Sequence, residues 1–185
     1  MNENLLPIES ISGTPKKCGE EYGEAFRTKL FGFCAQEVLP DKKRLNYAAK
    51  CEPYIKQYAS KSYQFLQGAS RSSGLSLHHL VLLSLHEEVI RLAITNPHCS
   101  AVACSGEFSK TKSALIGQNW DWASQLFPWP GLLRSKEKGS PSVLSYHYPG
   151  LWNCCGINSK GLSVMWTGAG YAPMIQPKVG VPTTL

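Results

Sequence analysis

The sequence changes its hydrophobic period once, near Pro97, and this change constrains the fold more than any other feature. Before it, apolar residues recur at every fourth position, as in Tyr22, Phe26 and Leu30, which is the spacing of one helix face. After it, short apolar runs alternate with turn residues, a pattern typical of strands. A helical segment that leads into an antiparallel set of strands predicts an α+β fold.

The expected elements follow from the same patterns. A first helix is predicted from about Lys16 to Val38, and a second begins with Asp41 as its N-cap. A Ser/Gly-rich loop is predicted over 68–74, after which Ser76 caps a third helix. The strands are expected at 99–108, 113–120, 143–148, 152–157 and 161–166.

Composition and charge exclude several classes of protein. The 185 residues are 43% hydrophobic and carry a net charge of +6, without the dense basic stripe of a nucleic-acid binder. His and charged residues interrupt the most apolar stretch, 75–93, so we expect no transmembrane segment, no membrane partner and, by default, a cytoplasmic protein. The seven cysteines include no CxxC pair, which argues against a disulfide framework or a structural metal.

Charge is also distributed unevenly along the chain. Residues 99–185 contain seven lysines and arginines but only three acidic residues. An acidic side chain in this segment is therefore conspicuous, and Asp121 stands at the end of the second predicted strand.

Several motifs resemble those of one family. Its opening pattern G-T-P-x-x-x-G-x-x-x-G and its sextet G-Q-N-W-D-W are both present and occur in the family's order. On these residues the chain is similar to the acyl-CoA:6-aminopenicillanic acid acyltransferase (peptidase C45) family. The matching segments are 11–15 with Gly19 and Gly23, 98–101, 117–122, 156–164 and 180–182.

This resemblance implies an N-terminal nucleophile (Ntn) hydrolase with an αββα sandwich fold. Such a proenzyme cuts its own chain, here between His98 and Cys99. The Cys99 thiol would then attack an amide or thioester carbonyl, and the new α-amino group would act as the base. An α-amino group titrates near 7.7–8.0 and a thiol near about 8.5, so the two groups are matched around neutral pH. The substrate would be a small amide or acyl thioester, and the mechanism implies no cofactor and no metal.

Two cysteines compete for the role of nucleophile. Side chains alternate along a strand, so Cys99 and Cys104 lie on opposite faces, and only Cys99 has the family's offset to the sextet. The alternative is that Cys99 is a structural thiol. Asp121 is expected to orient the Cys99 amine or, alternatively, to cap the strand end.

Supporting roles fall to residues near these two. His98 precedes the scissile bond and would assist an N-to-S acyl shift, although any residue could stand there. Gln118 and Asn119 precede Asp121 in the sextet, and the related bile-salt and penicillin V hydrolases have Arg in place of Gln118. Trp120 and Trp122 are expected to pack or to line an acyl pocket, together with the loop 127–131. The remaining candidates are predicted to be structural: His78, His79, His86 and the Cys154–Cys155 pair.

The resemblance also divides the chain. Residues 1–98 would form a helical pro-segment that is released, and 99–185 would form the N-terminal portion of the catalytic core. The oxyanion-hole Asn and a downstream Arg of the family would lie beyond Leu185, so only the first part of the sandwich is expected here. An exposed sheet face would then favour self-association. The alternative to an enzyme is an inactive truncated isoform or pseudoenzyme that binds without catalysis, which Thr167 in place of a common Asn also suggests.

Overall fold

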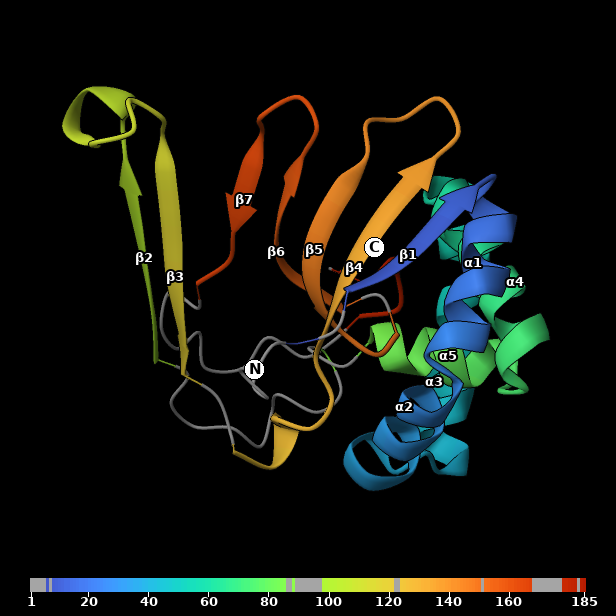
Figure 1. Ribbon diagram of the computed structural model, residues 1–185. Coiled ribbons are helices and arrows are strands. Elements are labelled where there is room, and N and C mark those ends of the chain that lie inside the picture. The colour runs from blue at the N-terminus through green and yellow to red at the C-terminus, as the bar shows by residue number, and fades with distance from the viewer. Residues whose placement is uncertain are drawn as a thin grey trace.

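The computed structural model describes residues 6, 8–85, 88, 98–121, 124–150, 152–167, 178–182, 184 and 185. In this part of the chain, five α-helices pack on one side of a five-stranded sheet, and a two-stranded sheet stands beside it (Figure 1). The α+β class predicted from the sequence is confirmed. The described part of the chain contains no helix long and apolar enough to cross a membrane.

The helical layer is formed by the first half of the chain, and its two predicted caps are present. The Asp41 carboxylate accepts a hydrogen bond from the Arg44 amide at 2.7 Å, and the Ser76 hydroxyl accepts one from the His79 amide at 3.4 Å. The helical elements are α1 (Pro15–Ala25), α2 (Arg27–Phe33), a short π-helical segment η1 (Cys34–Val38), α3 (Lys42–Tyr58), α4 (Ser60–Ser73) and α5 (Leu77–Ser84).

Two helix predictions are wrong in detail. The single helix expected from Lys16 to Val38 is divided, because the backbone of Phe26 leaves the helical region between α1 and α2. The loop expected over 68–74 is helical, and α4 ends only at Gly74, whose φ of +86° suits a glycine at a helix C-terminus. Residues 86, 87 and 89–97, where the third helix was expected to continue, lie outside the described residues.

The glycines of α1 and α4 explain this error. Gly19 and Gly68 lie where the two helices touch: a Cβ atom on Gly19 would be 2.0 Å from the Phe65 carbonyl oxygen, and one on Gly68 would be 2.0 Å from the Lys16 carbonyl oxygen. Gly68 is therefore needed for close helix packing, not for a turn. The spacing of Gly19 and Gly23 has the same reason, because Gly23 contacts the Ala69 backbone.

The larger sheet has the strand order β1-β4-β5-β6-β7, and the smaller sheet pairs β2 with β3. Strands β4 to β7 form an antiparallel meander, of which β5, β6 and β7 were predicted; the two strands predicted at 99–108 and 113–120 were expected in the same meander but form the separate two-stranded sheet. The strands are β1 (Ile8–Gly13), β2 (His98–Cys104), β3 (Leu115–Asp121), β4 (Gly131–Glu137), β5 (Val143–Tyr148), β6 (Trp152–Asn158) and β7 (Ser163–Met165), with 3-10 turns η3 (Gly106–Phe108) and η4 (Ser124–Leu126).

Two of these strands were missed by the sequence analysis: β1, because the first 97 residues were expected to be helical, and β4, because no strand was expected between 120 and 143. Strand β1 pairs in parallel with β4, from Ile8 opposite Leu132 to Gly13 opposite Glu137. Each strand buries one large apolar side chain against the helices, Ile11 in β1 and Leu133 in β4. Segments 1–98 and 99–185 therefore share one sheet.

The helices cover the face of the sheet that carries Ile11, Leu133 and His147. On this face the His147 ring packs edge-on against Phe26, with ring centres 4.8 Å apart. The Tyr22 hydroxyl accepts a hydrogen bond from the Gly150 amide, which ties α1 to the turn after β5. Burial of these apolar groups between helices and sheet forms the core.

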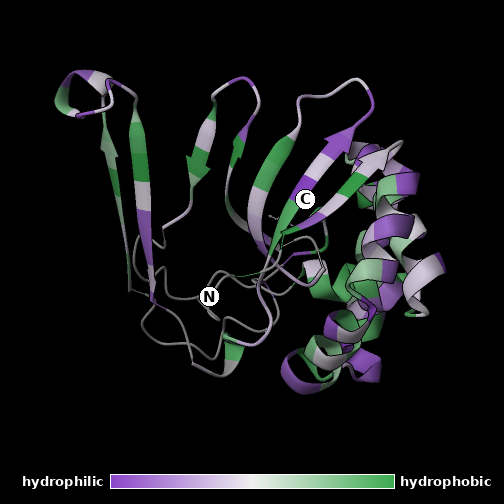
Figure 2. Cartoon of the chain, viewed as in Figure 1, coloured by the Kyte–Doolittle hydropathy of each residue, from purple (hydrophilic) through white to green (hydrophobic). Residues whose placement is uncertain are grey.

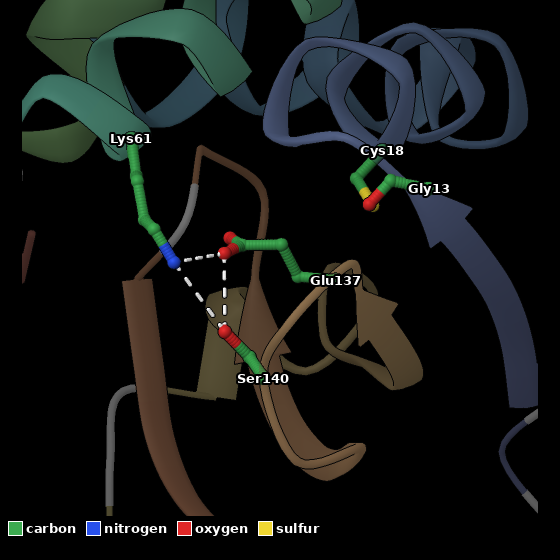
Figure 3. Close-up of polar contacts among 5 residues, drawn as sticks. All are labelled: Gly13, Cys18, Lys61, Glu137 and Ser140. Atoms are coloured by element: carbon green, nitrogen blue, oxygen red, sulfur yellow. Dashed lines mark hydrogen bonds and ion pairs between the residues drawn. The ribbon is translucent and has the colours of Figure 1, made fainter.

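A polar contact closes the outer end of this layer. Lys61, in the first turn of α4, pairs with Glu137 at the end of β4, and the Ser140 hydroxyl donates to the same carboxylate at 3.2 Å (Figure 3). Nearby, the Cys18 thiol donates to the Gly13 carbonyl at 3.7 Å, below the point where β1 leads into α1. The Lys61–Glu137 pair holds the β4–β5 turn against α4, and the Cys18–Gly13 contact joins α1 to the end of β1.

Candidate functional site

The β2–β3 pair brings together the residues that the sequence analysis singled out. Both strands lie where the sequence predicted them, and their register places His98 opposite Asp121 and Cys99 opposite Trp120. The peptide bond between His98 and Cys99 therefore lies across the strand pair from the Trp120–Asp121 segment. Cys99 is half-buried, whereas Asp121 is exposed.

Alternation along the two strands divides the site between two faces. We call the face with Cys99, Gln118 and Trp120 the thiol face, and the face with Asn119 and Asp121 the carboxylate face. On the carboxylate face, the Asn119 side-chain amide donates to the Asp121 carboxylate at 2.9 Å. The thiol and the carboxylate thus flank the backbone of residues 98 and 99 from opposite sides.

The thiol face also holds the hairpin to the larger sheet. The Gln118 side-chain amide donates to the carbonyl of Trp166, the residue after β7, and the Trp120 and Trp166 rings meet at 6.3 Å. The Trp166 carbonyl can only accept, so the Gln118 amide nitrogen must face it. The Gln118 oxygen is then a buried acceptor without a hydrogen-bond partner among the described residues. Sequence reasoning missed Trp166, which only its contacts across the sheets identify.

Burial raises the thiol pKa of four of the cysteines that the structure describes. Desolvation raises the pKa of the Cys34 thiol to about 11 and also raises the pKa of Cys18, Cys51 and Cys155, which suppresses their reactive thiolates. Cys104 lies on the carboxylate face and donates to the Ser105 carbonyl. The side chain of Cys154 lies outside the described residues.

The histidine side chains in the described part of the chain contact residues other than Cys99. His78 contacts the Glu52 carboxylate at 2.8 Å, and His79 contacts the Ser76 hydroxyl at 2.7 Å, so both are accounted for by neighbours within the helical layer. His86, Trp122 and the His98 side chain lie outside the described residues. His147, which the sequence analysis did not select, is buried, and its burial lowers its pKa to about 4.

The loop 127–131 is anchored on the helices. The Trp129 ring packs against Phe33 with centres 5.9 Å apart, and its indole N–H donates to the Glu37 carboxylate at 3.1 Å. Lys29 donates to the Pro130 carbonyl at 2.7 Å. The Trp129 ring therefore serves to fix this loop to α2 and η1.

A comparison of the chain with protein-family models gives no match, and a comparison with curated protein sequences gives none at the threshold applied.

Proposed function

We propose that this chain is a self-processing cysteine amidohydrolase or acyltransferase of the Ntn type, with Cys99 as its nucleophile and Asp121 as the group that binds the new α-amino group. The observation that carries the proposal is the β2–β3 register, in which the His98–Cys99 peptide lies opposite Trp120 and Asp121. The motif resemblance supplies the reaction class, and the register supplies the neighbours that the reaction needs.

The first step is self-cleavage. The Cys99 sulfur attacks the carbonyl carbon of His98, a C–S bond forms, and the C–N bond breaks as the Cys99 nitrogen takes up a proton. Water then hydrolyses the thioester and leaves the His98 carboxylate and the free Cys99 thiol. Asp121, held by Asn119 on the opposite face from the thiol, lies on the side where it can bind the new ammonium group without blocking the sulfur.

The second step repeats this chemistry on a substrate. The thiol attacks the carbonyl of a small amide or thioester, and the Cys99 amine passes the thiol proton to the leaving group. Water or an acceptor amine then attacks the acyl-enzyme and regenerates the thiol. Gln118 and Trp120 adjoin the sulfur on the thiol face and would contact the acyl group.

Cleavage at this bond would leave the two pieces associated, contrary to the release expected from the sequence. Strand β1 belongs to the N-terminal piece but pairs with β4 along its whole length. Tyr22 and Phe26 pack against His147 in the core, which adds burial to the hydrogen bonds. The product would be a two-chain protein in which residues 1–98 remain part of the fold.

Intact-mass spectrometry of the purified chain tests the first step. We expect two masses that sum to the chain plus one water and divide at His98–Cys99, together with a single elution peak under native conditions. Cys99→Ala should give one uncut mass, and the matched variant Cys104→Ala should cleave as the parent does. A folded parent chain that stays uncut, or equal loss of cleavage in Cys104→Ala, would contradict the proposal.

One observation favours the second candidate, a binding protein without catalysis. Cys99 and Asp121 lie on opposite faces of the pair, and Asp121 is exposed rather than enclosed. A thiol-reactive acyl probe separates the two functions. Labelling of Cys99 well ahead of Cys104, with loss of the label to an added amine, indicates an acyltransferase site, whereas equal and stable labelling of both indicates a catalytically inactive protein.

A further inference from the structure

The excess of basic residues in the second half of the chain gathers at one edge of the structure. Four of the seven lysines and arginines of residues 99–185 lie in the turns of the β2–β3, β4–β5 and β6–β7 hairpins, a fifth, Lys136, lies one residue before the end of β4, and all five are exposed. We call this set of tips the basic edge. Its lysines are Lys110, Lys112, Lys136, Lys138 and Lys160.

Topology places the three tips on the same side. In an antiparallel meander the first and third turns lie at one edge, so the β4–β5 and β6–β7 turns are neighbours. Gln118, midway along β3, and Trp120, near the end of β3 away from its tip, contact Trp166, which follows the end of β7 away from its tip. Strands β3 and β7 therefore run in the same direction, and Figure 1 shows all three tips projecting at the upper edge.

The acidic residues at this edge do not cancel the charge. Glu137 is paired with Lys61 from α4, so its negative charge is offset from outside the turns. Glu107 is the other acidic residue in the three turns. The edge thus keeps a net positive charge over three separate loops, and Figure 2 shows hydrophilic colour at these turns.

Large apolar side chains stand among the lysines. Phe108, at the β2–β3 tip, is 79% exposed, and Leu162, at the β6–β7 turn, is 65% exposed. Each lies within two residues of a lysine in sequence. Apolar side chains that project beside lysines from loop tips fit the boundary between lipid headgroups and acyl chains, where the cation meets phosphate and the apolar group meets hydrocarbon.

We propose that the basic edge binds the surface of an anionic phospholipid bilayer. A nucleic acid is the alternative anionic partner, but the three turns contain no arginine and a single aromatic side chain, Phe108, whereas single-strand binding stacks successive bases on several aromatic residues. The proposal departs from the expectation of no membrane partner, which depended on the lack of an apolar span. Binding through loop tips requires no such span.

Vesicle flotation of the full chain tests the proposal, because aggregated protein sinks while bound protein floats. We expect the chain to float with phosphatidylcholine vesicles that contain about one third phosphatidylserine, to remain behind with phosphatidylcholine alone, and to be released at high salt. Replacement of Lys110 and Lys112 by Gln should weaken binding about 10- to 30-fold, since each lysine near an anionic surface contributes about a factor of five.

Matched variants at the α2–α3 connection, away from the three tips, provide the controls. Lys42 and Lys43 are an exposed pair there, and their replacement by Gln makes the same charge change. Leu39→Ser, at a side chain 58% exposed, is the counterpart of Phe108→Ser. We expect both control variants to float as the parent does and Phe108→Ser to bind less at unchanged net charge.

A second charge variant guards against a local folding defect in the hairpin. Replacement of Lys138 and Lys160 by Gln, on the other two tips, should reduce flotation to a similar degree. No flotation of the parent with anionic vesicles would overturn the proposal, as would equal losses in the Lys42/Lys43 variant. Tighter binding to duplex DNA than to vesicles, unaffected by Phe108→Ser, would assign the edge to nucleic acid.

Discussion

The contact between α1 and α4 gives the sharpest stability prediction, the effect of Gly19→Ala. A Cβ atom at this position would lie 2.0 Å from the Phe65 carbonyl oxygen and 3.0 Å from the Ala69 nitrogen. Both atoms belong to the α4 backbone and cannot rotate away. To restore an ordinary contact the helices must separate by more than about 1 Å, and gaps of that size forfeit about a quarter to a half of each dispersion contact.

The expected cost combines two opposing terms. Alanine is favoured over glycine inside a helix by about 1 kcal/mol, whereas overpacking in a well-packed core costs about 1–3 kcal/mol and more when backbone must move. Because backbone atoms oppose the new methyl group, we expect a net loss of about 2–3 kcal/mol in the free energy of unfolding. For a chain of this size the loss corresponds to a fall of about 4–12 °C in Tm.

Urea unfolding and thermal denaturation monitored by circular dichroism measure this effect. Gly32→Ala is the matched comparison: it has the same helix-propensity gain, but the new methyl group would meet the Trp129 ring at 2.6 Å rather than backbone atoms, and the ring can move by loosening its contacts with Phe33 and Glu37. We expect Gly32→Ala to cost about 1–2 kcal/mol, less than Gly19→Ala. If Gly19→Ala is as stable as the parent, or no worse than Gly32→Ala, the close-packing explanation of the glycine pattern is wrong.

Two further predictions concern charged groups. Burial lowers the pKa of His147 to about 4 from an unfolded value of about 6.5, so on acidification the unfolded chain takes up the proton first. The free energy of unfolding is therefore unaffected by this residue above about pH 6.5 and falls by about 3 kcal/mol as the pH approaches 4. Urea midpoints measured across this range should lose most of that slope in His147→Gln, and an unchanged slope would assign it to other groups. Lys61→Ala should cost at most about 1 kcal/mol at low salt, because the lysine is largely exposed, and the loss should shrink at high salt. A larger, salt-independent loss measured by the same denaturation would show that packing of the Lys61 side chain dominates.

The sequence predicted the elements whose signals are local. Asp41 and Ser76 are caps that act within one helical turn. Strands β5, β6 and β7 show both apolar runs and adjacent turn residues. It missed β1 and β4 because each buries one large apolar residue against the helices, Ile11 or Leu133, and their parallel pairing joins distant segments. Gly68 was taken as a loop residue because its reason lies on another helix.

The candidate site divides in the same way. Strand alternation correctly separates Cys99 from Cys104, since that depends only on a period of two. The placement of Asp121 on the face opposite the thiol depends on the register of the β2–β3 pair, which the long connection between the strands sets and the strand sequences do not. The link from Gln118 to Trp166 joins two sheets and has no signal in either segment alone.

The parallel pairing of β1 with β4 also sets an order of events during synthesis. Ile8 leaves the ribosome early, but its partner Leu132 follows on the order of a hundred residues later, so the edge of the sheet stays open while the helical layer is already complete. Contacts of such long sequence separation form slowly. Under the proposed cleavage at His98–Cys99, a chain cut before β4 emerges would lose its first strand to diffusion, so β1 would have to dock before the cut for both pieces to end in one molecule.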